Sequence, residues 1–490
     1  MGWWFTDGLW ATDYDVARFI LQRGVAALFL VAFLSSLNQF PALLGERGLL
    51  PAPALLRHPA HLRGPTLFRW VRYTDARLRL VCGAGMLIAA SLVAGLPQLG
   101  PPWLPMIAFL ALYGLYMSIV HIGQTFYGFG WEMLILEAGF LMAFLGSNDQ
   151  PAPTTILVLN AWLVFRLEFG AGMIKIRGGR EWRDLTALMY HHETQPMPGP
   201  LSRQAHLLPP WFHRGEVLGN HFAQLVVPWL LFAPQPIASI AAAIIVLTQL
   251  WLVITGNFAW LNWITIVLAC GAISDRAIAA ALSWLLPPSL SVPVEGPDAS
   301  TAPLWWLLVT LLVTGLLVVL SWWPVRNLFA RRQLMNASFN RWQLGNAYGA
   351  FGTVTKRRIE VVIEASSAAD PGAEDWRAYE FKGKPGDVRR VPRQWAPYHL
   401  RLDWLMWFLP LGTVHERWLY ALLEKLLQAD AATLRLLRLD PFDGARPRWI
   451  RVRTYHYRFS THAEFRETRQ RWIRTPRQVV IAPVGLSEPS

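Results

Sequence analysis

Long apolar runs dominate the first two thirds of the chain. A transmembrane helix needs roughly 20 predominantly apolar residues, because the hydrocarbon core of a bilayer is about 30 Å thick. Runs that meet or approach this length lie at 18–40, 78–96, 103–122, 126–146, 154–176, 216–233, 236–255, 257–274 and 303–323. A further run, 278–286, is too short to span alone. The pattern predicts a polytopic α-helical membrane protein with about 8–9 transmembrane helices, formed by residues 1–323.

The pattern changes period after residue 323. The segments RRIEVVIEA (357–365) and WIRVRTYHYRF (449–459) are rich in β-branched and aromatic residues, and the second alternates apolar and charged positions as a half-buried strand does. Helical spacing of apolar residues recurs only at about 415–428. We therefore expect a mainly-β soluble domain in residues 324–490, with one helix.

Charge separates the same two parts. Only 16% of the 490 residues are charged, against about 25% in soluble chains. Residues 1–323 hold 17 Lys+Arg and 16 Asp+Glu, whereas residues 324–490 hold 28 and 16, so nearly all of the net charge of +13 lies in the last third. The arginines there are dispersed among acidic residues, which favours lipid headgroups or an acidic protein as partner, and no nucleic-acid partner is predicted.

Loop charges predict which segments share a side of the membrane. The 41–76 loop has five arginines against two acidic residues, and an Arg/Lys excess is typical of cytoplasmic loops. With nine spans, this loop, the 177–215 loop and the C-terminal domain lie together in the cytoplasm, and the N-terminus lies outside. Long domains escape the rule, so the charge pattern leaves the orientation open.

Lys175 is the only lysine in residues 1–323 and lies near the end of a predicted span. It is seven residues from Glu168, so the two share a helix face. A desolvated lysine can act as a base near neutral pH. The alternative is a lysine that reaches the membrane interface and pairs locally.

Glu137 is the other candidate catalytic residue, because an acidic side chain inside a span is often functional; a hydrogen-bonded structural carboxyl is the alternative. The histidines His191, His192, His206, His213 and His221 invite a metal hypothesis. No established ligand spacing such as HExxH is present, so no metal site is predicted.

Long strings along nearly the whole chain resemble the lipase maturation factor family. They are FRLEFGAGMIKIRG, WRDLTALMYHHETQPMP, LPPWFHR, ITGNFAWLNWITIVL, NAYGAFGTVTKRRIEVVIEAS, YEFKGKPGDVRR and PYHLRLDWLMWF. The resemblance implies a multi-pass membrane protein that helps secreted lipases fold and assemble. It also implies that the C-terminal domain faces the lumen of the endoplasmic reticulum, opposite to the loop-charge prediction, and binds the client.

Candidate client-binding residues lie in the last of these strings: Arg401, Asp403, Trp404 and Trp407. The membrane half is also similar, more remotely, to the membrane domains (HTTM domains) shared with vitamin K-dependent γ-carboxylase, whose catalytic lysine matches Lys175 or a neighbour. We expect a loop at the rim of a cavity reaching Lys175, formed by Arg183, Asp184, Tyr190, His191, His192, Glu193 and Gln195.

Two functions follow. The first is a membrane-anchored maturation factor, with chaperone-like action on lipases or similar clients. The alternative is an integral-membrane enzyme that acts on a lipophilic or peptide substrate through Lys175, with Glu168 or Glu137 assisting. No cofactor is predicted. The expected partners are the lipid bilayer and a client protein, and the expected location is the inner membrane for a bacterial source or the endoplasmic reticulum membrane for a eukaryotic one.

Overall fold

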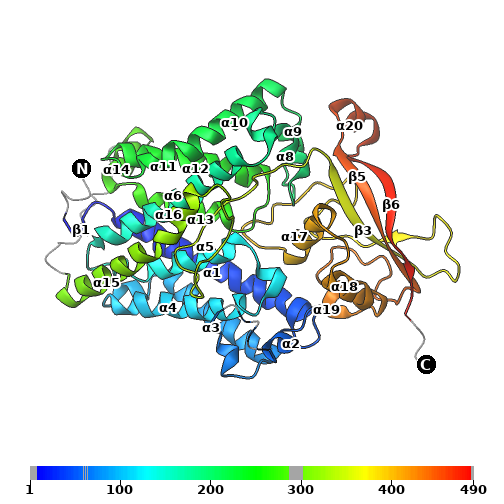
Figure 1. The fold of residues 1–490 in the computed structure, drawn as a ribbon, viewed down its shortest axis with the longest axis horizontal. Coiled ribbons are helices and arrows are strands. Elements are labelled where there is room, and N and C mark those ends of the chain that lie inside the picture. The colour runs from blue at the N-terminus through cyan, green and yellow to red at the C-terminus, as the bar shows by residue number, and fades with distance from the viewer. Residues whose placement is uncertain (1–7, 59, 61, 63, 286–301, 487–490) are drawn as a thin grey trace.

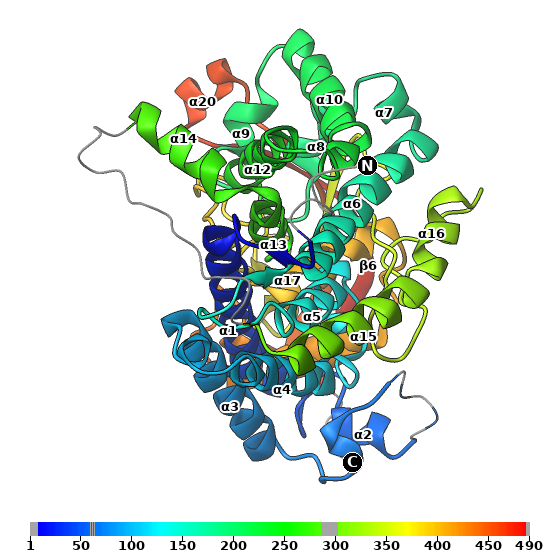
Figure 2. The same ribbon diagram turned by 90° about the vertical axis from the view of Figure 1, so that its left-hand side faces the viewer.

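The computed structural model describes residues 8–285, except 59, 61 and 63, and residues 302–486. Figure 1 shows a helical bundle at the left and a twisted sheet with short helices at the right. Figure 2 looks onto the bundle from its far end, where the N-terminal segment lies and the sheet is behind. The two parts correspond to the apolar and the charged portions of the sequence.

Helices form the first part. The long ones are α1 (Asp15–Leu44), α3 (Asp75–Ala94), α4 (Trp103–Val120), α6 (Thr154–Arg177), α10 (Pro210–Leu225), α12 (Ile237–Thr255) and α15 (Leu304–Leu320). Shorter ones are α2 (Ala52–Leu56), α5 (Gly130–Met142), α7 (Arg180–Arg183), α8 (Leu188–Thr194), α9 (Ser202–His206), α11 (Val227–Leu230), α13 (Leu261–Ala269), α14 (Asp275–Leu285) and α16 (Trp322–Phe329). The strands β1 (Trp10–Ala11) and β2 (Ala152–Pro153) pair antiparallel.

Six helical segments in the described residues are long and apolar enough to cross a membrane: α1, α3, α4, α6, α12 and α15 with α16. A seventh span results if α13 and α14, bent by 98° from each other, count as one. The predicted membrane class is confirmed. The predicted eight or nine spans exceed the six or seven helical segments that are long and apolar enough in the described residues. Three of the predicted runs account for the difference.

Those three runs form shorter helices inside the bundle. α5 has 13 residues and is thus only about 20 Å long, and α13 has nine. The 216–233 run is divided between α10 and α11 and carries several polar side chains. A helix that is apolar on all sides is typical of a buried core as well as of a membrane span, so hydropathy alone cannot distinguish them.

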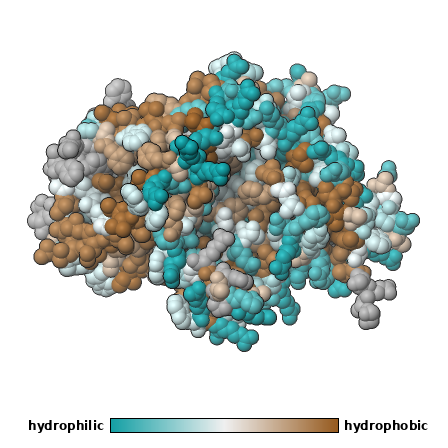
Figure 3. All heavy atoms as spheres, viewed as in Figure 1, coloured by the Kyte–Doolittle hydropathy of each residue, from teal (hydrophilic) through white to brown (hydrophobic). Residues whose placement is uncertain are grey.

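The outer surface of the bundle is apolar. α15 is an example, because Leu312 is 75% exposed and Val319 is 70% exposed. Figure 3 shows apolar side chains gathered over the bundle, whereas polar side chains are frequent over the opposite end of the molecule. Apolar surface of this extent needs a hydrocarbon environment, as a membrane-embedded bundle has.

The second part contains a four-stranded antiparallel sheet in the order β4-β3-β5-β6. Its strands are β3 (Arg358–Ser366), β4 (Arg377–Ala378), β5 (Trp449–Phe459) and β6 (Trp472–Val484). β3 and β5 match the two predicted strands. β6 is an edge strand that tolerates Pro476, a residue that is rare in central strands.

Helices cover one face of this sheet. The predicted helix at 415–428 is confirmed as α18 (Arg417–Leu427). The helices α17 (Arg401–Phe408), α19 (Ala431–Leu434) and α20 (His462–Thr468), with the 3-10 turn η8 (Leu409–Leu411), complete the C-terminal region. Val361, Ile363 and Ile450 of the sheet share one buried core with Trp404 and Trp418. The C-terminal region is therefore strand-rich but contains more helix than the sequence pattern predicts.

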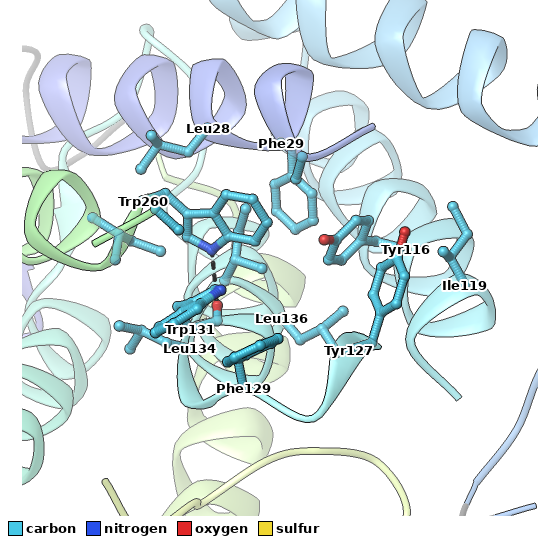
Figure 4. Packing of buried hydrophobic residues seen from close by; sticks show 14 of the residues in the cluster. Leu28, Phe29, Tyr116, Ile119, Tyr127, Phe129, Trp131, Leu134, Leu136 and Trp260 are labelled. Carbon is cyan, nitrogen blue, oxygen red and sulfur yellow. Dashed lines mark hydrogen bonds between the residues drawn. The ribbon is translucent and has the colours of Figure 1, made fainter. Parts of the chain in front are cut away.

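The core of the bundle is aromatic where it meets the C-terminal region (Figure 4). Trp131 of α5 stacks on Phe129, and Trp260 donates its indole N–H to the carbonyl oxygen of Trp131 at 2.9 Å. Phe29 and Tyr116 meet edge to face, 5.9 Å between ring centroids. This aromatic layer is the surface of the bundle on which C-terminal residues such as His399 and Trp404 pack.

Candidate functional site at the junction of the bundle and the C-terminal region

The junction is held first by a fully buried ion pair. Arg401 of α17 donates to the carboxylate of Glu132 in α5 at 2.6 Å, and both side chains have no exposed surface. The hydroxyl of Tyr116 also donates to Glu132, and the Arg401 guanidinium lies 3.5 Å above the ring of Tyr127. Such a pair is strongly destabilised when one partner is removed, because the other charge stays buried.

Glu137, the candidate intramembrane acid, anchors a second C-terminal segment. Its carboxylate accepts from Arg166 of α6, from the backbone N–H groups of Gly345 and Asn346, and from the hydroxyl of Tyr348 at 2.8 Å. These donors occupy the lone pairs of the carboxylate. The contacts favour the structural alternative for Glu137 over a role as free acid or base.

A third contact holds the C-terminal end of α8 and the loop that follows it. Arg358 of β3 is 2% exposed and donates to the carbonyl oxygens of Glu193 and Pro196, at 2.9 and 3.0 Å, and to that of Gln195. The Glu193 carboxylate in turn accepts from the backbone N–H of Phe459 at 2.7 Å. We call residues 191–198 the docking loop, because the sheet sits on them.

The residues predicted for a cavity rim are thus divided between two environments. Arg183 and Asp184 are exposed, and Tyr190 is partly exposed. His191 is buried and stacks on Phe258, 6.0 Å between centroids. His192, Glu193 and Gln195 are buried in contacts beneath the C-terminal region instead of surrounding an opening to Lys175.

Lys175 lies in a polar layer inside the bundle. Its ammonium donates to the amide oxygens of Asn220 and Gln224, at 2.9 and 2.8 Å, and lies 4.6 Å from the ring centroid of Trp182. The other end of Gln224 donates to Glu168 at 3.0 Å, so this amide links the two charges that the helix face brings together. The sequence predicted the shared face but not the bridging amide.

The layer continues across the bundle to α13. Gln249 donates to Glu168 at 2.7 Å, and Asn262 donates to Gln249 at 2.6 Å. All three side chains are buried. Two amide oxygens and the ring of Trp182 surround the Lys175 nitrogen, an arrangement that suits a charged ammonium as a hydrogen-bond donor.

The predicted client-binding residues are mostly internal. Arg401, Asp403 and Trp404 are at most 2% exposed. Asp403 accepts from the backbone N–H of Gly383 at 2.6 Å, and Trp404 packs on Trp131. The expectation that these three contact a client is therefore not supported, because their partners lie within the chain. From the sequence alone, these residues resemble aromatic or charged surface groups, because their partners are distant in the chain.

Trp407 is partly exposed and donates its indole N–H to the carbonyl oxygen of Thr194 at 3.0 Å. It therefore joins α17 to the docking loop. Asn257 makes a separate contact with the segment before α17, since its carboxamide oxygen accepts from the backbone N–H groups of Trp395 and Ala396. Several of the sequence strings that resemble the family therefore lie where the bundle and the C-terminal region meet.

These contacts also test the predicted grouping of loops. His121 at the end of α4 contacts both the carbonyl oxygen of Pro65 and the side chain of Gln343, and Arg203 of α9 donates to the carbonyl oxygen of Ser460. The 41–76 loop, the 177–215 loop and the C-terminal region therefore lie on one side of the bundle, as predicted. β1 lies at the opposite end (Figure 1).

A cavity of about 1240 Å³ lies along the junction. It is bounded by the end of α4, the 3-10 turn η4 (Gln124–Tyr127), α5, residues 336–343 and the segment from α17 to α18. Phe408 and Leu411 line it and are 43% and 47% exposed. Lys175 is not among its lining residues.

The histidine-rich stretch brings together a group that the sequence did not indicate. His192, His213 and Glu216 approach one another, with ligand atoms within 4.8 Å. Glu216 was missed, although its spacing of three from His213 on a helix was a usable signal. Burial lowers the pKa of the neighbouring His206 to about 4, so that side chain is neutral near pH 7.

Fold and junction define a polytopic membrane protein whose strand-rich C-terminal region is locked onto one end of its helical bundle. Two family models match this chain: the lipase maturation factor transmembrane domain over residues 16–280, and the lipase maturation factor C-terminal domain over residues 344–482. The chain belongs to the lipase maturation factor family.

Curated relatives agree along nearly the whole chain. Lipase maturation factor 1 of Bos taurus is 40% identical, over 92% of this chain and 85% of the relative. The Homo sapiens protein of that name is 37% identical, over 96% and 88%. Lipase maturation factor 2 of Homo sapiens is 30% identical, over 93% and 81%. No solved structure matches the fold.

Proposed function

We propose that this protein is a membrane-anchored maturation factor that assists the folding and assembly of secreted lipases or similar client proteins. The observation that carries the proposal is the agreement of both regions with relatives named lipase maturation factor 1, at 37–40% identity. The match covers the C-terminal region as well as the bundle. A shared membrane anchor alone would not require the second match.

The junction cavity is the surface that best suits a client. Folding intermediates expose apolar side chains, and a large cavity with mixed apolar and polar lining can receive them. Phe408 and Leu411 supply exposed apolar groups, while Asn340 and Thr413 supply polar ones. The proposed client contact therefore lies at the exposed C-terminal end of α17 and not on its buried face.

The test is a secretion assay in cells that lack their own maturation factor and that express a secreted lipase together with this protein. We expect this protein to raise the lipase activity per unit of secreted lipase. The double substitution F408D/L411D abolishes most of the gain, because two carboxylates oppose an apolar ligand. Leu439→Asp is the matched control, since Leu439 is similarly exposed at 41% but is not part of the cavity lining.

Two results would contradict the proposal at different levels. If the unsubstituted protein gives no gain, the maturation role itself is wrong. If F408D/L411D retains the full gain at equal membrane levels of protein, the role stands but the cavity is not the client surface.

The enzyme alternative has less support from the geometry. Lys175 donates to two amide oxygens, Glu168 accepts from two amides, and Glu137 is held by the C-terminal region. Lys175→Met in the same secretion assay separates the two functions. A maturation factor retains its effect in this variant at equal protein levels, whereas an enzyme that uses Lys175 loses it.

A further inference from the structure

Three buried side chains from two helices converge at the docking loop, one of them from the loop itself. His192 lies on α8, and His213 and Glu216 lie one turn apart on α10. Nε2 of His192 is 3.2 and 3.4 Å from the two carboxylate oxygens of Glu216. Nδ1 of His213 is 2.9 Å from one of them. The side chains of all three are at most 9% exposed.

The ring of His213 lies between two hydrogen-bond acceptors. Its Nδ1 faces Glu216, and its Nε2 faces the carbonyl oxygen of His206 at 3.3 Å. An imidazole with a single N–H can donate to only one of them. A metal ion bound at Nδ1 would leave the N–H on Nε2, where it can donate to that carbonyl oxygen. Nδ1 of His192 does not face Glu216 and has no hydrogen-bond partner among the described residues.

The nitrogen–oxygen separations are close to those between neighbouring ligands of a metal ion. In a tetrahedral zinc site with bonds of 2.0–2.1 Å, neighbouring ligand atoms lie about 3.3 Å apart. The nitrogen–oxygen distances in this cluster lie on either side of that value, and the three ligand atoms fall within 4.8 Å of one another.

Outer contacts orient two of the three groups, His213 and Glu216. The carbonyl oxygen of His206 fixes the ring of His213, and the indole N–H of Trp251 donates to Glu216 at 2.6 Å. Contacts of this kind, to the far nitrogen of a histidine and to a ligating carboxylate, are typical of metal sites. The cluster thus has supports as well as ligands.

We propose that His192, His213 and Glu216 bind a divalent transition-metal ion of the zinc class, with a fourth position left for water or another donor. Two imidazoles and one carboxylate are a ligand set that zinc accepts. This site is independent of the proposed maturation role, because it rests on the described side chains alone. It differs from the sequence-based prediction, which assigned no metal site.

The position of the site gives it a structural task. His192 directly precedes Glu193, whose backbone carbonyl accepts from Arg358 and whose carboxylate accepts from Phe459. A metal ion that links α8 to α10 would therefore fix the docking loop to the bundle, while Arg358 and Phe459 of the sheet contact the same loop. Removing the metal would loosen the sheet from the bundle.

The test uses the full-length protein in lipid nanodiscs, purified with an affinity tag that contains no histidine, since a polyhistidine tag binds metal itself. After incubation with zinc and removal of free ions, we expect elemental analysis to find about one zinc ion per chain. X-ray absorption at the zinc edge should show nitrogen and oxygen ligands at about 2.0–2.1 Å and no sulfur. This spectrum needs no variant and so does not depend on a substitution being tolerated.

Glu216→Gln and His213→Ala should reduce the bound zinc at least tenfold. His221→Ala is the matched control, because His221 lies on the same helix and contacts the carbonyl oxygen of Trp182 instead. A strong chelator should lower the unfolding temperature of the unsubstituted protein but not that of Glu216→Gln.

Several results would overturn the proposal. Unsubstituted protein that retains no zinc, copper, iron or manganese would show that the cluster is a hydrogen-bonded triad and not a metal site. Bound zinc that is equal in Glu216→Gln and the unsubstituted protein would place the ion elsewhere, as would sulfur ligands in the absorption spectrum.

Discussion

The polar layer at Lys175 and the ion pair at Arg401 are both buried charge networks, but they join different parts of the molecule. The Lys175 layer is formed by α6, α10, α12 and α13, so it lies wholly within the bundle. The Arg401 pair takes one charge from the bundle and the other from the C-terminal region. The first network therefore specifies how helices pack, and the second specifies whether the two regions stay together.

The largest effect is expected from Arg401→Met. The substitution leaves Glu132 buried without its cation, and breaking a buried pair in this way costs about 3–5 kcal/mol. We expect the C-terminal region to detach or to become accessible to protease while the bundle remains in the membrane. Limited proteolysis of membranes, with fragments identified by mass, measures this.

An exposed ion pair in the same region serves as the control for that substitution. Arg438 pairs with Glu380 and retains 34% side-chain exposure. Arg438→Met should change protease sensitivity little, because a partly exposed pair contributes about 0–1 kcal/mol. Equal sensitivity of the two variants would mean that the Arg401 pair does not control docking.

Lys175→Met tests the network that lies wholly within the bundle. It removes a donor from Asn220 and Gln224, and each buried polar group left unsatisfied costs about 1–3 kcal/mol. The unfolding temperature of the bundle should fall, but the protease sensitivity of the C-terminal region should stay as in the unsubstituted protein. Detachment of that region by this substitution would show that the two networks are coupled.

Acid should weaken the junction through His399, which lies in the segment before α17 and next to Arg401. Burial, with the charge of Arg401, lowers the pKa of His399 to about 4, against an ordinary value of 6.5. The detached form binds the proton more readily between these values, so docking loses stability as pH falls from about 6.5 towards 4.

At pH 5 the loss is at most about 2 kcal/mol, from 1.36 kcal/mol per pKa unit. Proteolysis at pH 7 and pH 5 with an acid-tolerant protease measures it. His399→Asn removes the titrating group, so its pH dependence should be weaker. An unchanged pH dependence in that variant would assign the effect to another group.

The smallest effect is expected at the surface. Arg180 and Asp184 form an ion pair at 2.7 Å, but their side chains are 81% and 48% exposed. Arg180→Ala should shift the unfolding temperature by no more than the about 0–1 kcal/mol typical of exposed pairs. A larger shift would mean that the α7 segment contributes to docking.

Much of the architecture could be predicted from local pattern. Apolar length correctly located α1, α3, α4, α6, α12 and α15, and alternation located β3 and β5. Pattern failed for α5, because burial inside protein and burial in lipid both select apolar residues. The predicted number of spans therefore exceeds the six or seven that helix length and composition give.

The candidate sites depend on contacts that are distant in the chain. Arg401 and Glu132 are 269 residues apart, and a single sequence holds no signal that pairs them. Arg401 and Trp404 consequently resembled surface groups available to a client. The His213 and Glu216 spacing was local and could have been read, but His192 joins them only through the packing of α8 on α10.

The pairing of Glu132 with Arg401 also sets an order for biogenesis. At translation rates of about 5–20 residues per second, Arg401 is made tens of seconds after Glu132 has entered the membrane. During that interval the carboxylate has no cation from the C-terminal region. A chain truncated before residue 401 would keep that acid without its cation for its lifetime.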